Sequence, residues 1–97
     1  MTPAEQHHAM RIAQLEEATG LTWEHEGTSR YICTEQVTAY CYFSESHGCT
    51  MRVSGCVDLD GAEVHLHASA SDPDISRAWA VARNARDAAV KRLTETP

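Results

Sequence analysis

The feature that most constrains the fold is an Asp60-Gly61 dipeptide between two segments in which apolar and polar residues alternate. Asp-Gly is the strongest short signal for a two-residue β-hairpin turn. The alternation over 51–57 and 62–68 is typical of strands that are buried on one face only. The sequence therefore predicts a hairpin with one apolar face and one polar face.

The register of this hairpin decides which side chains share a face. A turn at Asp60-Gly61 places Val57 opposite Val64, and these residues then lie on the apolar face together with Met51, Val53 and Leu66. The polar face would hold Arg52, Ser54, Cys56, Glu63, His65 and His67.

Two amphipathic helices are expected, one near each end of the chain. Thr2 is a good N-cap and Gly20 a good C-terminal stop for a helix over about 3–19. The segment Ser71-Asp72-Pro73-Asp74 is typical of a second helix start, with the proline at the first helical position. The apolar stripe of that helix would consist of Ile75, Ala78, Trp79, Ala82, Ala85, Ala89 and Leu93.

Three shorter strands are expected ahead of the hairpin, over 21–25, 30–34 and 38–43. Pairing Phe43 with Met51 would bury the phenylalanine and leave Tyr40 and Tyr42 on the polar face. Residues 1–97 are thus predicted to form a single α+β domain, a two-layer sandwich. An antiparallel sheet of four to five strands would carry both helices on one face, and its other face would meet solvent or a partner.

The charge balance narrows the classes of partner. The 14 acidic and 8 basic residues give a formal net charge of −6, which disfavours binding to a nucleic-acid backbone or to an anionic membrane. No apolar run is long enough to span a bilayer, and the first residues lack the pattern of a signal peptide. A cytoplasmic location is expected, in which the four cysteines stay as thiols.

His65-x-His67 is the sharpest chemical signal, because alternation puts both imidazoles on one face with Cys56 opposite His65 and Glu63 two residues back. Such residues are plausible zinc ligands, so a zinc-binding regulatory module is one alternative. We interpret them instead as the polar side of an amphipathic strand, and we predict no metal and no cofactor. The cysteines lack the spacing of a zinc knuckle, and no catalytic signature surrounds any of them, so the chain is predicted not to be an enzyme.

The last helix is locally basic, which raises a second alternative. Helix, three strands and helix is the order of double-stranded-RNA-binding domains. We interpret the basic residues as a solvated face with Arg83–Asp87 and Asp87–Lys91 pairs, because the lysine cluster of those domains is missing. In the same way, His7 and His8 are interpreted as part of a solvated helix face.

The polar sheet face is the remaining candidate for function. Tyrosine and arginine are enriched at protein interfaces, and acidic residues around such a face can compete for basic grooves. The predicted partner-binding residues are Glu24, Glu26, Tyr40, Tyr42, Arg52, Glu63, His65 and His67. Further carboxylates are expected to form an acidic rim around them, including Glu16, Glu17, Glu35, Glu45, Asp58 and Asp60.

The chain resembles the small acidic phage proteins called anti-CRISPRs. The resemblance lies in size, acidity and helix–sheet–helix order, and locally in Trp23-Glu-His-Glu-Gly27 followed by Tyr31, which is similar to an acidic tryptophan turn of a type I-F inhibitor. It implies a non-enzymatic inhibitor in the host cytoplasm. The implied partner is a protein complex with a basic groove, such as a Cas effector, with no direct binding to nucleic acid or membrane.

Overall fold

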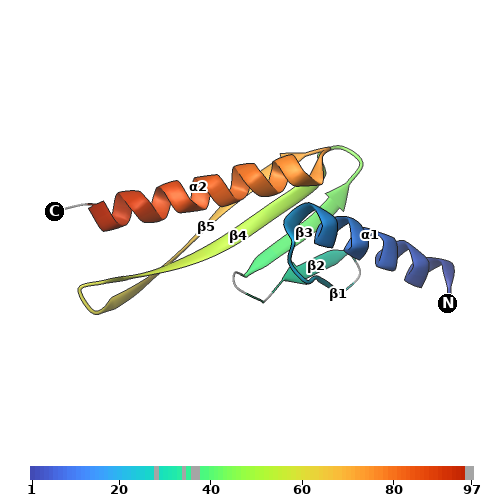
Figure 1. Ribbon diagram of the computed structural model, residues 1–97, viewed down its shortest axis with the longest axis horizontal. Coiled ribbons are helices and arrows are strands. Elements are labelled where there is room, and N and C mark those ends of the chain that lie inside the picture. The colour runs from blue at the N-terminus through green and yellow to red at the C-terminus, as the bar shows by residue number, and fades with distance from the viewer. Residues whose placement is uncertain (28, 34, 36–37, 96–97) are drawn as a thin grey trace.

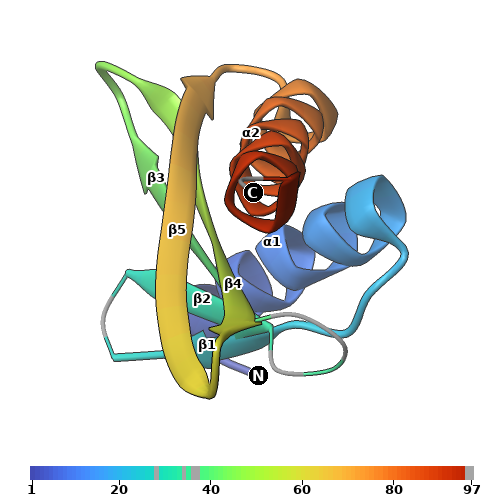
Figure 2. The ribbon, with the colours of Figure 1, turned by 90° about the vertical axis from the view of Figure 1, so that its left-hand side faces the viewer.

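The computed structural model describes residues 1–27, 29–33, 35 and 38–95. The elements, in chain order, are α1 (Pro3–Thr19), β1 (Glu24–Glu26), β2 (Arg30–Cys33), β3 (Ala39–Ser44), β4 (Gly48–Leu59), β5 (Ala62–Asp72) and α2 (Ile75–Glu95) (Figure 1). The strands form one antiparallel sheet in sequential order. Both helices lie on the same side of it (Figure 2). The predicted two-layer α+β fold is confirmed.

The molecule is elongated, with principal extents of 54 × 23 × 21 Å. The long β4–β5 hairpin and α2 extend together beyond the three shorter strands (Figure 1). The helix-covered side of the sheet is its inner face, and the opposite side is its outer face. The buried core lies on the inner face and includes Leu15, Trp23, Tyr31, Cys33, Cys41, Met51, Val53, Trp79 and Ala82.

The β4–β5 hairpin turns at Asp60-Gly61, as predicted. Asp60 and Gly61 both have positive φ, 54° and 83°, as a type I′ turn requires. Val57 pairs with Val64, so the predicted register is confirmed. Pairing continues past the predicted ends of the strands, and β5 runs to Asp72 rather than stopping at residue 68.

The predicted pairing of Phe43 with Met51 is wrong. Phe43 pairs with Cys49, and Met51 pairs with Cys41. The difference arises at the turn, which closes at Gly48 with a φ of 73° and leaves a loop of three residues. Because the shift is two residues, every side chain keeps the face that was predicted for it.

The strand predicted over 21–25 begins later, at Glu24. Trp23 is instead part of the core, only 2% exposed, and its indole Nε1 donates a hydrogen bond to the Thr19 hydroxyl at 2.8 Å. The strands predicted over 30–34 and 38–43 are observed at Arg30–Cys33 and Ala39–Ser44. Thr34, the predicted end of the first of these, lies outside the described residues.

The second helix starts later than predicted because β5 occupies the residues that were expected to cap it. The Asp74 carboxylate accepts a hydrogen bond from the amide of Ser76 at 2.9 Å, so Asp74 acts as the cap. Pro73 therefore precedes the helix instead of opening it. Asp72 supports this junction by accepting a hydrogen bond from the amide of Asp74 at 2.8 Å.

The predicted apolar stripe of α2 fails at Ala85, which is exposed. Arg86 takes the sheet-facing position, with 14% of its side chain exposed. It can approach because the sheet residue beneath it is Gly55, where an added Cβ would lie 3.0 Å from Arg86 Cδ. The guanidinium donates to the carbonyl of Ser54 at 3.3 Å and pairs with Asp87 at 2.8 Å, which replaces the predicted pairs of Asp87 with residues 83 and 91.

Candidate partner-binding face

The sheet brings all eight predicted partner-binding residues onto its outer face. Buried residues such as Tyr31, Cys41 and Met51 point inward, and their neighbours along each strand point outward. The cross-strand pairs place Tyr40 beside Arg52 on this face. The eight residues come from four strands, namely β1 (Glu24, Glu26), β3 (Tyr40, Tyr42), β4 (Arg52) and β5 (Glu63, His65, His67).

The two tyrosines differ in how freely they could contact a partner. Tyr42 is 38% exposed. Tyr40 is half-buried, with the Arg30 guanidinium carbon 4.9 Å from its ring centroid. Arg30 also forms an ion pair with Glu26 across the β1–β2 hairpin. Arg30 thus belongs to this face. It was not among the predicted partner-binding residues, although strand alternation places it on the same face as Ile32 and Tyr42.

The acidic rim that was predicted around the face is only partly present. Asp58 pairs with Glu63 across the hairpin, so both carboxylates lie on the outer face. Glu16 and Glu17 lie on α1, in the helix layer, because this helix packs against the inner face. Glu16 reaches the backbone amide of Trp23 at 3.5 Å. The outer face is therefore mildly acidic, with carboxylates interleaved with Arg30 and Arg52.

Three outer-face side chains, Cys56, Glu63 and His65, form a compact group near the end of the long hairpin, which we name the hairpin cluster. The Cys56 thiol donates a hydrogen bond to Glu63 Oε1 at 3.0 Å, and His65 Nε2 lies 3.8 Å from the same oxygen. The hydrogen bond to Glu63, followed by desolvation, raises the pKa of Cys56 above its ordinary value. His67, which the zinc alternative included, lies two pairs further along the ladder, opposite Ser54.

The inner face holds a second histidine group, which was not predicted. His8 was expected on a solvated helix face, but its Nδ1 lies 2.8 Å from the Tyr31 hydroxyl and its ring stacks on His25 at 3.6 Å between centroids. Desolvation, then the nearby His25 and His7, lower the pKa of His8 below its ordinary value. The contact ties α1 to β1 and β2. Its neighbour His7 is exposed, as predicted.

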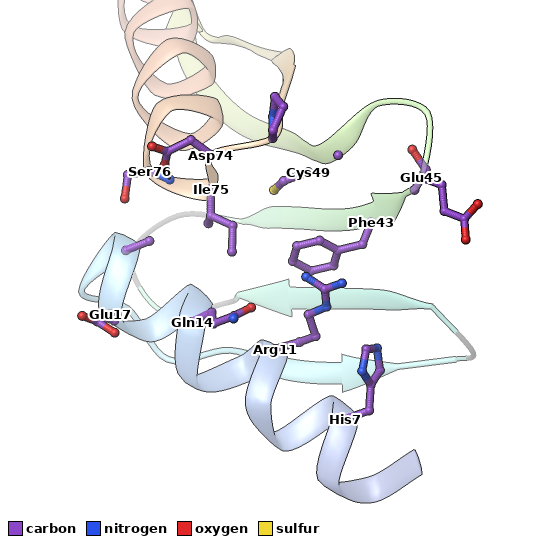
Figure 3. A pocket seen from close by; sticks show the side chains of 14 residues that line it. His7, Arg11, Gln14, Glu17, Phe43, Glu45, Cys49, Asp74, Ile75 and Ser76 are labelled. Carbon is purple, nitrogen blue, oxygen red and sulfur yellow. Dashed lines mark hydrogen bonds between the residues drawn. The ribbon is translucent and has the colours of Figure 1, made fainter. Parts of the chain in front are cut away.

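A cleft of about 820 Å³ separates α1 from the start of α2 and the β3–β4 turn. Figure 3 shows Arg11 reaching from α1 to the ring of Phe43, where its guanidinium carbon lies 4.1 Å from the ring centroid. Cys49 lies at the base of this cleft, with its sulfur 3.3 Å from that of Cys41. The hydrogen bond between the two thiols, followed by burial, raises the pKa of Cys41, which keeps it protonated.

The basic residues of α2 are largely committed to local ion pairs. Arg77 lies 3.8 Å from the Asp72 carboxylate, and Lys91 lies 3.8 Å from that of Glu95. Arg86 is held against the sheet.

Comparison of the chain with protein-family models, with curated proteins and with solved structures found no match. Neither helix of the described residues has the length and apolar character needed to cross a membrane.

Proposed function

We propose that this protein is a non-enzymatic inhibitor of the anti-CRISPR type, which binds a protein complex through the outer face of its sheet and blocks a nucleic-acid-binding groove. The observation that supports this proposal is that Tyr40, Tyr42 and Arg52, which are of types enriched at interfaces, lie among carboxylates and histidines on the one sheet face that neither helix covers. A sheet face with tyrosine and arginine among polar neighbours has the composition of a protein interface.

Tyr42 is the anchor of the proposed interface. It is the more exposed tyrosine, and burying its ring would remove a large apolar area from water while its hydroxyl keeps a polar partner. Tyr40 and Arg52 form a cross-strand pair on the same face, two residues along the strands from the pair of Tyr42 with Thr50. Residues of these types carry a large share of binding energy in protein interfaces.

The negative charge of the protein is expected to affect the rate at which it associates with the partner. The net charge of −6 favours encounter with a basic groove, and Glu24 is an exposed carboxylate at the β1 edge of the face. Such long-range attraction raises the association rate and weakens with salt, because exposed charges are screened over about 8–10 Å near physiological ionic strength.

The test uses purified, guide-loaded Cas effector complexes and measures their DNA binding and cleavage with and without this protein. For a complex that is inhibited, surface binding kinetics are recorded at two salt concentrations. Tyr42→Ala should speed dissociation, and reversing Glu24 and Glu26 together to lysine should mainly slow association.

The matched control reverses Glu17 and Glu45 to lysine, since both are exposed carboxylates that line the cleft beside α1 and not the outer face. This variant has the same net charge as the Glu24/Glu26 variant. Inhibition of no effector complex, or equal effects of the two double reversals on association, would contradict the proposal.

A further inference from the structure

The hairpin cluster has a donor set that differs from that of an ordinary solvated strand face. One thiol, one carboxylate and one imidazole offer ligand atoms that all lie within 4.8 Å of one another. Around a tetrahedral zinc ion, ligand atoms at bond lengths of about 2.0–2.3 Å would be separated by roughly 3.3–3.8 Å. Cys56 Sγ lies 3.0 Å from Glu63 Oε1, a little below this range, and His65 Nε2 lies 3.8 Å from the same oxygen, at its upper end.

The backbone holds these residues in place. Cys56 and His65 are directly opposite in the β4–β5 ladder, and Glu63 precedes His65 by two residues on the same face. The register is set by the Asp60-Gly61 turn and by the pairs on both sides of the cluster. All three residues are exposed, so their side chains have room to turn toward a shared ion.

We propose that the hairpin cluster binds a single zinc ion through Cys56 Sγ, a Glu63 oxygen and a His65 ring nitrogen. A mixed sulfur, oxygen and nitrogen donor set suits zinc rather than magnesium or calcium, which prefer oxygen ligands. The site has three protein ligands and faces solvent, so the fourth position is open to water or to another donor.

His67 is the nearest further donor in the chain. It shares the outer face with His65, two residues away, which separates their Cα atoms by about 7 Å. A zinc ion held by three ligands at the edge of the proposed interface would also be accessible to a donor from a bound molecule. The zinc site does not depend on the proposed inhibitor function, and its test requires no partner.

The experiment titrates Zn²⁺ into the full chain, without a polyhistidine tag and in a thiol-free reductant, by calorimetry. Co²⁺ is titrated in parallel, because a cobalt–thiolate bond gives a charge-transfer absorption in the near ultraviolet. One ion per chain is expected. Removing even a residue that only orients a metal ligand typically costs about 10–100-fold in affinity, so Cys56→Ser, Glu63→Gln and His65→Gln should each weaken binding at least ten-fold.

The matched controls are His7→Gln and His47→Gln, which remove exposed histidines on α1 and in the β3–β4 turn. Both should leave zinc affinity unchanged. His67→Gln identifies the fourth ligand. Weaker zinc binding in this variant would mean that His67 supplies the fourth ligand, and unchanged binding would mean that water does. Both results support the three-residue site.

Amide and imidazole NMR shifts of the wild-type chain on zinc addition give an answer that does not depend on variants. The largest shifts should fall at residues 56, 63 and 65. Absence of binding at 100-fold molar excess of Zn²⁺ over protein, loss of binding in His7→Gln, or retention of the cobalt–thiolate band in Cys56→Ser would each overturn the proposal.

Discussion

Among single residues, Cys56 is set apart from the other cysteines by exposure, since Cys33, Cys41 and Cys49 are buried. Thiols react as thiolates, and the hydrogen bond to Glu63 raises the pKa of Cys56. We therefore expect a maleimide to label one thiol per native chain, and Glu63→Gln to speed that labelling by increasing the thiolate fraction near pH 8. Mass spectrometry over time gives both the site and the rate.

The control for this prediction is Glu45→Gln, an exposed carboxylate that has no hydrogen bond to a cysteine. It should label at the wild-type rate. Rapid modification of a second cysteine under native conditions, or identical rates for Glu63→Gln and wild type, would contradict the structure at this position.

The titration of His8 makes the stability of the fold depend on pH. Its pKa is lowered in the folded state from an ordinary value of 6.5, because desolvation, His25 and His7 disfavour its charged form. Below pH 6.5 the unfolded chain therefore binds more protons at His8 than the folded chain does, so the free energy of unfolding falls as the pH falls. The contribution of His8 to the free energy of unfolding is therefore complete above pH 6.5 and is lost as the pH falls below it.

Thermal unfolding at pH 7.5 and pH 5.5 tests this effect. His8→Gln keeps a polar group near the Tyr31 hydroxyl but removes the titration, so its Tm should decline less at pH 5.5 than that of the wild type. His47→Gln is the control, because the His47 ring is exposed in the β3–β4 turn and hydrogen-bonds to its neighbour Ser46. Equal declines for His8→Gln and wild type would mean that His8 does not couple proton binding to folding.

For single residues, the sequence could predict the sheet face on which each strand residue lies but not which side chains touch one another. Strand alternation correctly placed Cys56 and His65 on one face, because the side-chain period of a strand is two. It could not show that Glu63 lies nearer to Cys56 than His67 does. It also could not show that His8 stacks on His25, because that contact joins a helix to a strand 17 positions away in the chain.

At the scale of elements, Gly48 fixes how the β3–β4 turn meets the start of α2. Its φ is 73°, and an added Cβ would lie 2.7 Å from Pro73 Cα, which is backbone and cannot move aside cheaply. Gly20, at the end of α1, has the same φ but nothing within 4 Å of an added Cβ. An alanine substitution at Gly20 therefore introduces backbone strain alone, whereas one at Gly48 introduces the same strain together with a steric overlap.

We expect Gly20→Ala to cost about 1–2 kcal/mol, the usual penalty for a left-handed residue with a Cβ. Gly48→Ala should cost clearly more, because the overlap with Pro73 adds to the same strain. Urea denaturation of the two variants measures the difference. Equal losses would show that the β3–β4 turn and the β5–α2 junction do not touch as described.

Element boundaries were predictable where a local signal dominates. The Thr2 cap of α1 is present, with the Glu5 amide donating to the Thr2 hydroxyl at 3.1 Å, and Gly20 ends the helix. The start of α2 was mispredicted because Asp72 pairs with Cys49 in the sheet, and pairing with a distant strand outweighs a local capping preference.

At the scale of the whole molecule, the contact of Trp23 with Trp79 joins the α1 end of the structure to α2. The rings meet edge to face at 6.2 Å between centroids, and both are buried. Trp79→Ala should lower the free energy of unfolding by roughly 3–5 kcal/mol, as large aromatic truncations in cores do. Val81→Ala, on the same helix but 52% exposed, should change it little.

Chemical denaturation of both variants checks this expectation, with circular dichroism to confirm that each retains its helices. A small and equal loss in the two variants would show that Trp79 does not hold α2 to the rest of the core. The predicted position of Trp79 in the core is confirmed by the structure, where it is 6% exposed. The burial of Trp23 was not predicted, because its partner lies 56 positions further along the chain.

The sequence by itself determined the class of fold, the β4–β5 register and the face on which each strand residue lies. These properties depend on residues a few positions apart, through turn chemistry, capping and a side-chain period of two. The tertiary structure alone decided the approach of Arg86 to Gly55, the stacking of His8 on His25 and the separation of Glu17 from the outer face. Each of those depends on contacts between elements distant in the chain, where packing and steric fit select among arrangements that local patterns allow equally.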